Sequence, residues 1–358
     1  MTKLEKLIQE LCPDGIEYRC LKDSVSIMRG TRVVKNQLME TGEYPVFQNC
    51  LTPMGYYNKF NCKENTVFII VAGAAGEIGY SSTDFWAADD CFCLICPPNL
   101  ESRFLYHNLL SQHNFILSKV RRASIPRLAR DVVENLSIPV PPLPVQREIV
   151  RILDNFTELT AELTAELTAR KQQYAYYRDK LLAFGDDVPK DTLENLCDFQ
   201  YGKGNSIPTA PGEYPVYGCN GVVGTTNVFN SIDAPVIGHI GSAGIVNWGK
   251  GKHFVTYNGT ICKVRPEKMI SRYAYHLLCS LHLERFVKGS QPFLSYSDFA
   301  KETVAVPPLN IQQRVVSILD RFDTLCTDLS SGLPAEIEAR QKQYEYYRDK
   351  LLSFEEKI

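Results

Sequence analysis

Long hydrophobic runs are missing from this sequence. Its apolar segments, such as residues 66–72, are much shorter than the roughly 20 residues that a membrane-spanning helix needs. The first residues also lack the basic and then apolar order of a signal peptide. With 358 residues, of which 44% are hydrophobic and 22% charged, the chain is long enough to form two hydrophobic cores of ordinary size. We therefore predict a globular protein located in the cytoplasm.

An excess of basic residues is missing as well. The 39 Lys and Arg residues and the 41 Asp and Glu residues give a formal net charge of -2, whereas proteins that bind nucleic acids are usually basic. The acidic residues, however, crowd the helical blocks described below and the termini. Basic residues of loop-like stretches are still able to contact phosphates. These are Arg29, Arg32, Lys35, Arg121, Arg122, Arg127, Arg130, Lys203, Lys250 and Lys252.

The cysteines do not form a complete metal-binding pattern. Cys93 and Cys96 have the two-residue gap of a zinc half-site, but the usual second pair is missing. Cys91, Cys93 and Ile95 alternate as one face of a strand does, and cysteine is a common small core residue. We therefore expect free thiols in a strand and no metal site.

Complete catalytic motifs are missing too. Gly244, Gly249 and Lys250 have the spacing of a phosphate-binding loop, but Gly251 stands where a Ser or Thr that binds magnesium is needed. No Pro-Pro pair is preceded by Asn or Asp and followed by an aromatic residue, as in the loop of amino-methyltransferases. We therefore expect no catalytic residue in this chain.

What the chain does contain is a duplication. The segment QYAYYRDKLL at residues 173–182 returns as QYEYYRDKLL at residues 343–352. Upstream, PPLPVQREIVRILDNF at residues 141–156 returns as PPLNIQQRVVSILDRF at residues 307–322. Two like units in one chain permit pseudo-twofold symmetry, which suits binding to DNA or to paired partners.

Four segments follow from composition and periodicity. Residues 1–142 and 186–308 are rich in Gly, Pro, aromatic and β-branched residues in short runs, which indicates strand-rich mixed domains. Residues 143–185 and 309–358 repeat apolar residues at helical spacing and contain little Gly. We predict an α+β fold with long helices from 144 to 184 and from 310 to 354. Ser330, Gly332 and Pro334 predict that the second block is broken into two helices.

The duplication extends faintly into the mixed domains. EYPV at residues 43–46 returns at 213–216, GAAG at 73–76 pairs with GSAG at 241–244, and His107 pairs with His276. We expect these histidines to be packed or hydrogen-bonded rather than catalytic.

The residues that differ between the copies are mostly polar. Gln48 and Asn49 stand against Gly218 and Cys219. The paired carboxylates Asp89 and Asp90 stand against Tyr257 and Asn258, which argues against a repeated acid catalyst. One scaffold with two sets of polar loops suits the recognition of two different DNA sequences.

The helical blocks have the apolar stripes of helices that pair. Two such helices are able to pack antiparallel and separate the mixed domains; the alternative is that each helix only caps its own domain. The first block contains TELTAELTAEL at residues 157–167, which steps by four. Loss of one such unit shortens a helix by about 6 Å and rotates it by about 40°.

With these motifs the chain resembles the DNA-specificity subunit of type I restriction–modification systems. The resemblance rests on the tandem layout, the PPL and ILDxF blocks, the QYxYYRDKLL endings and the TAEL run. It implies two target-recognition domains, which each recognise half of a bipartite double-stranded DNA target, and helical connectors that fix the gap. It also implies two modification (methyltransferase) subunits that carry S-adenosylmethionine, and restriction subunits with ATP and magnesium, with no cofactor in this chain.

The candidate base-contacting residues are polar residues beside turns, because Arg and Lys suit guanine whereas Asn and Gln suit adenine. In the first domain they are Arg29, Arg32, Gln48, Asn49, Arg121 and Arg127, and in the second Lys203, Asn205, Asn220, Lys250, Lys288 and Gln291. The candidate residues for partner binding are Tyr174, Tyr177, Arg178, Tyr344, Tyr347 and Arg348. Two alternatives stay open at this point: a stand-alone DNA methyltransferase or endonuclease, and a scaffold that binds only proteins.

Overall fold

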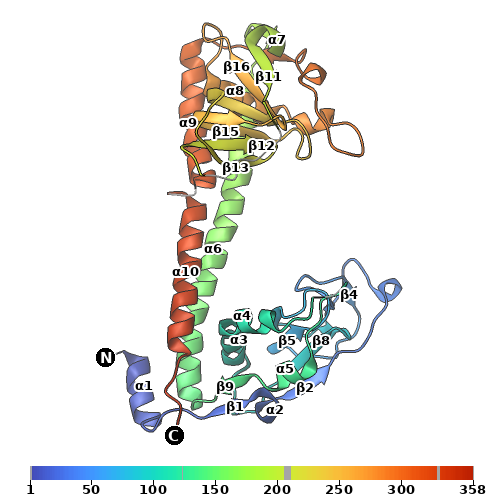
Figure 1. Cartoon of the computed structure of the whole chain (residues 1–358), viewed down its shortest axis with the longest axis vertical. Coiled ribbons are helices and arrows are strands. Elements are labelled where there is room, and N and C mark those ends of the chain that lie inside the picture. Colours follow the sequence, from blue (N-terminus) through green and yellow to red (C-terminus); the bar gives the residue numbers. More distant parts are fainter. Residues whose placement is uncertain (1, 123, 205–210, 329–330, 358) are drawn as a thin grey trace. The chain divides into compact units, whose positions relative to one another are not determined.

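The computed structural model describes residues 2–122, 124–204, 211–328 and 331–357, and it divides into two compact units (Figure 1). Unit 1 comprises Met1–Glu162 together with Ile337–Ile358, and unit 2 comprises Leu163–Glu336. Each unit therefore contains one mixed domain and parts of the long helices. Within the described residues, no helix is both long enough and apolar enough to span a membrane.

Unit 1 is built from short strands and helices. Its strands form a four-stranded antiparallel sheet of order β2-β8-β5-β6, a three-stranded sheet of order β4-β3-β7 and the pair β1-β9. The strands are β1 (Tyr18–Cys20), β2 (Ser26–Arg29), β3 (Tyr44–Phe47), β4 (Tyr56–Tyr57), β5 (Thr66–Ile70), β6 (Ile78–Ser81), β7 (Trp86–Ala87), β8 (Cys91–Ile95) and β9 (Ser137–Pro139). The helices are α1 (Lys3–Leu11), α2 (Leu21–Ser24), the 3-10 helix η1 (Lys35–Gln37), α3 (Ser102–Ser111), α4 (His113–Ser118) and α5 (Arg130–Glu134).

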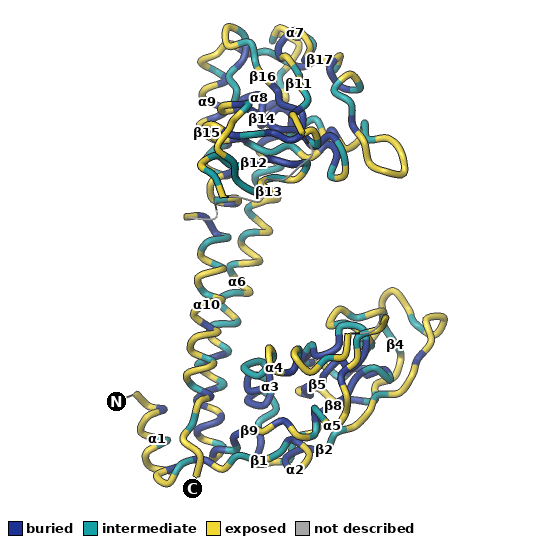
Figure 2. Tube along the Cα trace, in the orientation of Figure 1, coloured by how far each residue is buried: buried dark blue, intermediate teal, exposed yellow. Residues whose placement is uncertain are grey.

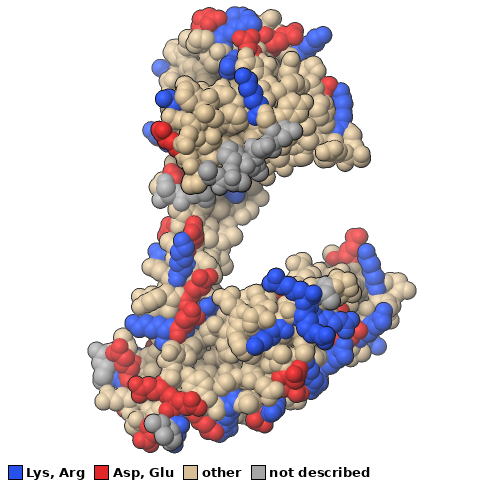
Figure 3. All heavy atoms as spheres, viewed as in Figure 1, with Lys and Arg blue, Asp and Glu red and all other residues tan. Residues whose placement is uncertain are grey.

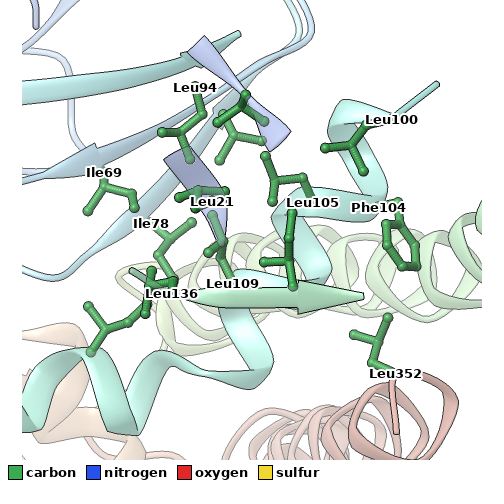
Figure 4. Packing of buried hydrophobic residues seen from close by; sticks show 14 of the residues in the cluster. Leu21, Ile69, Ile78, Leu94, Leu100, Phe104, Leu105, Leu109, Leu136 and Leu352 are labelled. Carbon is green, nitrogen blue, oxygen red and sulfur yellow. The ribbon is translucent and has the colours of Figure 1, made fainter. Parts of the chain in front are cut away.

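The main core of unit 1 lies between the four-stranded sheet and its helices. Every residue of β5 is buried, and the β-branched and aromatic side chains of this strand suit a position covered on both faces. Figure 4 shows part of this core, in which side chains of β5, β6 and β8 lie near those of α2 and α3. The labelled residues are Leu21, Ile69, Ile78, Leu94, Leu100, Phe104, Leu105, Leu109, Leu136 and Leu352.

Unit 2 repeats this plan with a larger sheet. Its six strands have the order β11-β16-β14-β15-β12-β13, and a separate pair is formed by β10 and β17. The strands are β10 (Lys190–Thr192), β11 (Cys197–Tyr201), β12 (Tyr214–Gly218), β13 (Gly221–Thr226), β14 (Ser231–Gly238), β15 (Val246–Val255), β16 (Gly259–Val264) and β17 (Thr303–Ala305). The helices are α7 (Leu193–Leu196), α8 (Ser271–Ser280), the 3-10 helices η2 (Leu283–Phe286) and η3 (Tyr296–Asp298), and α9 (Leu309–Thr327).

The repeated EYPV segment occupies the same place in both units. It contributes to β3 in unit 1 and β12 in unit 2. Each of these strands has one antiparallel neighbour and one parallel neighbour, which is β7 for β3 and β15 for β12. The faint duplication in the mixed domains therefore reflects a shared strand arrangement.

The long helices agree with the sequence prediction. The helix α6 (Leu143–Leu182) runs for 40 residues without a break, starting in unit 1 and ending in unit 2. The second block is split into α9 and α10 (Leu333–Leu351), as predicted. A Cβ atom on Gly332 would lie 2.7 Å from the carbonyl oxygens of Asp328 and Thr324, so the break requires a glycine at this position.

Within each unit, two of these helices pack antiparallel through a matched aromatic pair. In unit 1, Phe156 of α6 stacks on Tyr347 of α10 with ring centroids 5.3 Å apart. In unit 2, Tyr177 of α6 stacks on Phe322 of α9 at 5.6 Å. Figure 2 shows the TAEL stretch of α6 without any buried residue, in contrast to both ends of the helix.

Two near-motifs of the sequence are parts of strands. Gly249 and Lys250 belong to β15, so the phosphate-loop spacing is a coincidence. Cys91 and Cys93 lie buried on β8, as the alternation predicted, and the Sγ atom of Cys93 lies 2.8 Å from that of Cys62. Among the described residues there is no group of His, Cys, Asp or Glu side chains arranged to hold a metal ion.

Candidate nucleic-acid interface

Three loops meet at one end of the mixed domain in unit 1, and we call them the first loop cluster. They are the residues after β3 (48–49), the glycine turn 73–76 and the hairpin formed by residues 121–122 and 124–127. The N–H of Ala74 donates to the carbonyl of Asn49 at 2.8 Å, and the N–H of Gly73 donates to Pro126 at 3.2 Å. Gly73 has a φ of +83°, and a Cβ there would lie 2.8 Å from that of Asn49. The close approach of these loops therefore requires a glycine.

The hairpin of the first loop cluster presents unpaired guanidinium groups. Its ends are joined by two backbone hydrogen bonds, from Arg121 to Arg127 at 2.9 Å and from Arg127 to Arg121 at 3.1 Å. The side chains of Arg121, Arg122 and Arg127 are exposed, and none has a carboxylate partner within the described part of the chain. Figure 3 shows basic side chains gathered on unit 1. This surface is suited to phosphate oxygens and guanine edges.

The turn between β7 and β8 contacts two of the predicted residues, Arg29 and Gln48. Arg29 donates through Nε to the carbonyl of Asp89 at 2.8 Å, and the Nε2 of Gln48 donates to the carboxylate of Asp90 at 3.3 Å. The turn is tied to the cluster because Val71 donates its N–H to Asp90. The structure therefore brings together Arg29, Gln48, Asn49, Arg121 and Arg127, while Arg32 lies exposed beyond the end of β2.

Unit 2 has the same three loops, which we call the second loop cluster: residues 219–220, the glycine turn 241–244 and the hairpin 288–293. Gly241 donates its N–H to Pro292 at 3.0 Å, as Gly73 does to Pro126. Lys288 and Phe293 exchange two backbone hydrogen bonds at 2.9 and 3.1 Å. Both hairpins are thus anchored to a glycine turn by the same kind of contact.

The predicted residues of unit 2 are spread more widely than those of unit 1. Asn220 and Gln291 are exposed in the second loop cluster. Lys203 donates its N–H to Val255, the last residue of β15, which lies next to the end of β12 where this cluster begins. Lys288 is part of the hairpin, but its ammonium group is paired with Asp298 at 2.5 Å.

Two predictions in unit 2 fall outside this cluster. Lys250 lies in β15, next to Gly249, which pairs with Ala234, about 13 Å along β14 from Gly238 and the glycine turn. It is therefore not brought to the cluster. Asn205 lies outside the described residues.

Aromatic side chains, which sequence reasoning missed, form the centre of the second loop cluster. His239 lies between Tyr201 and Phe293, with ring centroids 4.2 and 4.6 Å away, and Tyr257 stands at 5.5 Å. Nδ1 of His239 lies 2.6 Å from the carbonyl oxygen of Leu294, which only accepts, so this nitrogen carries the proton. The signal available in the sequence was the exchange of Asp89 and Asp90 for Tyr257 and Asn258.

A matched polar network holds the long helices against each mixed domain. In unit 1, Asp154 of α6 accepts from Arg103 and His107 of α3, each at 2.8 Å, and His107 contacts the hydroxyl of Tyr344 at 2.9 Å. In unit 2 the corresponding residues are Arg272, His276, Asp320 and Tyr174. Both histidines are fully buried and hydrogen-bonded, which confirms the sequence prediction for them.

Burial and charge shift the pKa values in this network in the same way in both units. Burial lowers the pKa of His107, although Asp154 opposes this shift. Burial acts to raise the pKa of Asp154, but hydrogen bonds from His107 and Arg103 outweigh it and leave the pKa lowered. The repeated tyrosine therefore faces a neutral imidazole that is oriented by a carboxylate.

A family model for the type I restriction modification DNA specificity domain matches residues 13–170 and 187–339. The chain belongs to this family. The two matched stretches correspond to the two copies of the duplication. As a type I specificity subunit, the chain provides DNA recognition to a restriction–modification enzyme and is not the catalytic component, which excludes the stand-alone enzyme.

Relatives and solved structures agree with this assignment. The chain is 31% identical to a protein of Haemophilus influenzae named as a type I restriction enzyme specificity subunit, over 99% of this chain and 98% of that one. It is 37% identical to the EcoR124I/EcoR124II specificity subunit of Escherichia coli, over 62% of this chain and 63% of the relative. The fold is similar to the crystal structure of the S subunit from M. genitalium, with a TM-score of 0.67, 20% identity and coverage of 94% and 96%.

The QYxYYRDKLL motif of this specificity subunit has an inner and an outer side. Tyr174 and Tyr344 belong to the polar networks, and Tyr177 and Tyr347 form the aromatic pairs. The guanidinium groups of Arg178 and Arg348 are largely buried and lie next to Asp179 and Asp349.

The outer side of the motif is formed by Tyr176 and Tyr346. These side chains are 60% and 61% exposed, more than any other tyrosine of the motif. Sequence reasoning did not select them, although their position two residues after the inward-facing Tyr174 and Tyr344 places them on the far side of the helix.

Proposed function

We propose that this chain recognises a bipartite double-stranded DNA target, one half with each loop cluster. The observation that carries the proposal is the repeated geometry of three loops, in which a glycine turn anchors a hairpin in each unit. The backbone contacts match, whereas the exposed side chains differ. A shared frame with different side chains supports the recognition of two different half-sites.

The test is to map methylated adenines in the genome of a host that carries the complete system, with this chain and with a variant. In the variant Arg121→Ala/Arg127→Ala, we expect one half of the target to lose its sequence requirement while the other half is kept. The control Lys6→Ala removes an exposed charge of α1 in the same unit and should leave the target unchanged. Loss of both halves together, or of neither, would contradict the assignment of one half-site to each unit.

We further propose that the exposed tyrosines of the motif dock the partner subunits. The two copies of the motif offer two equivalent surfaces, which suits two modification subunits carrying S-adenosylmethionine. Restriction subunits would bring ATP and magnesium, and the assembly would act on DNA in the cytoplasm. Exposed tyrosine is a frequent anchor in protein interfaces, which supports a role for Tyr176 and Tyr346.

A docking test compares single and double variants of these tyrosines. We expect Tyr176→Ala and Tyr346→Ala each to lose about one modification subunit from the purified assembly, and the double variant to lose both. Phe229→Ala, at an exposed aromatic residue of unit 2 away from the motif, is the matched control. Unchanged stoichiometry in the double variant would exclude docking through these side chains.

The TAEL repeat is proposed to set the spacing between the half-sites. Its residues have no buried side chain, so units of four are removable without loss of core packing. Deletion of residues 160–163 shortens the helix by about 6 Å, compared with about 3.4 Å for one base pair. Methylation mapping should then show the same half-sites at a changed spacing, and an unchanged spacing with an altered half-site would refute this role.

A further inference from the structure

The two loop clusters present different chemistry to the same kind of ligand. In the first, three exposed arginines of the hairpin have no carboxylate partner among the described residues. In the second, the corresponding hairpin begins at Lys288, whose charge is offset by Asp298, and ends at the aromatic ring of Phe293. The last residue of the hairpin is therefore Phe293 in unit 2 and Arg127 in unit 1, and the first hairpin also exposes Ile125 at 54%.

Two partly exposed aromatic rings, those of Phe293 and Tyr257, share His239 as a neighbour. Both rings contact His239, at 4.6 and 5.5 Å between centroids, and His239 itself is only 1% exposed. Phe293 and Tyr257 are 39% and 40% exposed. The buried imidazole thus supports two rings that each present part of their surface to solvent.

The support behind this surface is fixed by hydrogen bonds as well as by packing. The backbone N–H of His239 donates to Asn258, next to Tyr257, at 2.8 Å, and its Nδ1 is held by Leu294, next to Phe293. Tyr201 stacks on the other side of His239 and its hydroxyl lies 3.0 Å from that of Ser295. The exposed rings are therefore held in place before any ligand binds.

In the major groove, the only apolar group at the edge of a base pair is the C5-methyl group of thymine. We propose that unit 2 recognises thymine through apolar contact of this methyl group with Phe293 and Tyr257. This inference rests on the proposed function, because it presumes that the second loop cluster contacts base edges. It assigns at least one A·T pair to the half-site of unit 2, and it gives Lys203 the separate task of contacting a phosphate.

The packing of the rings distinguishes this contact from insertion between base pairs. A side chain that unstacks bases must protrude with both ring faces free. Phe293 has one side against His239, and more than half of its surface is covered. The exposed part of each ring is therefore suited to lie against a methyl group at the surface of the groove.

Deoxyuridine provides a direct test, because it differs from thymidine only by this methyl group. The complex of this chain with its modification subunits is titrated with duplexes that carry the mapped target, and thymines are replaced by deoxyuridine in one half-site at a time. We expect about fourfold weaker binding for each contacted thymine in the half-site of unit 2, which corresponds to about 0.8 kcal/mol for one buried methyl group at 1.4 kcal/mol per factor of ten.

Variants connect the effect to the two rings. In Phe293→Ala, the difference between thymidine and deoxyuridine duplexes should shrink towards one, because the methyl group has lost its contact. Tyr257→Leu keeps an apolar side chain and should retain part of the difference. The control is Phe229→Ala, since Phe229 is similarly exposed at 43% but packs on Tyr214 and Lys252 beside other strands.

The possible results separate the two hypotheses. Sequence-specific binding without sensitivity to deoxyuridine in the half-site of unit 2 overturns the thymine contact and leaves the proposed function intact. The same holds for a half-site without any A·T pair, or for Phe293→Ala weakening thymidine and deoxyuridine duplexes equally, as an inserted wedge would. Absence of any sequence-specific binding overturns the proposed function and this inference with it.

Discussion

The first and second loop clusters have the same backbone frame but different exposed side chains. In each cluster, the first glycine of the turn donates its N–H to the carbonyl of a hairpin proline. The proline is Pro126 in unit 1 and Pro292 in unit 2. The first frame carries guanidinium groups that have no carboxylate partner among the described residues, whereas the second carries two exposed aromatic rings and a lysine that is paired with Asp298. Neither difference alters the glycine turns or the cores behind them.

This comparison shows how target recognition is separable from folding in such a protein. The residues that fix the frame are Gly, Pro and buried apolar side chains, whose roles depend on backbone geometry and volume. The residues that face DNA are exposed, so their replacement changes the free energy of unfolding by only a few tenths of a kcal/mol on average. The frame therefore permits new base contacts without a new fold.

The largest expected effect concerns the charges of the first loop cluster. Arg121→Ala/Arg127→Ala removes two unpaired cations and should weaken specific binding by about 2–6 kcal/mol if both contact bases. The dependence of log Kd on log salt concentration should also fall by about two if they contact phosphates. Lys288→Ala should have a much smaller effect on both quantities, because Asp298 already pairs with its ammonium group. Equal losses in the two units would contradict the charge difference between the clusters.

A second prediction compares the two glycine turns. Gly73→Ala adds a Cβ 2.8 Å from that of Asn49 at a φ of +83°, so we expect about 3 kcal/mol of destabilisation and loss of the half-site of unit 1. In Gly241→Ala, the nearest atom is the Sγ of Cys219 at 3.5 Å, so only the backbone strain of about 1–2 kcal/mol is expected. Urea unfolding monitored by tryptophan fluorescence measures both changes. A Gly241→Ala variant that is less stable than Gly73→Ala would show that the turns are not matched.

The helical part of the fold was predictable from sequence because its signals are local. Apolar residues at helical spacing located α6 to within about two residues at each end, and Gly332 with Pro334 located the break before α10. The pairing of helices through Phe156 and Tyr347 was predictable in kind, since two like stripes require a partner. These inferences depend on neighbours within a few turns of the chain.

The base-contacting surface was only partly predictable because it is assembled from distant loops. Residues chosen for their chemistry beside turns, such as Gln48 and Arg121, do converge in unit 1. The sequence prediction did not include Tyr257 and Phe293, because aromatic residues of this kind usually belong to the core. Only the structure places both rings against the buried His239. Lys250 lies outside the second loop cluster because β15 places it about 13 Å from the glycine turn, a separation that no local pattern reveals.

A third prediction tests whether the two polar networks are equivalent. Tyr344→Phe and Tyr174→Phe each remove one hydroxyl that lies 2.9 Å from the Nδ1 of a buried histidine. Each variant should lose about 1–2 kcal/mol of stability, because a buried hydrogen-bonding group is left without its partner. Tyr346→Phe, at the exposed side of the same motif, is the matched control and should lose almost nothing. The Arg, His, Asp and Tyr contacts are shared by both networks, although Arg272 has an additional pair with Asp323, so clearly unequal losses from the two tyrosines would mean that the units differ in stability despite these shared contacts.

The smallest expected effect is a shared response to acid. Burial lowers the pKa of His107 and His276 below the ordinary value of 6.5, so the unfolded chain binds more protons than the folded chain below that pH. Stability should therefore fall as the pH drops from 6.5, by at most about 1.4 kcal/mol per pH unit for each histidine. The lowered pKa values of Asp154 and Asp320 add a second loss below about pH 3.8, where the unfolded carboxylates become protonated first. Urea unfolding of His107→Gln and His276→Gln at pH 7.5 and pH 5.5 separates the two contributions. Each variant should remove only part of the pH dependence, because burial also lowers the pKa of His253, and a variant that removes all of it would assign the response to a single histidine.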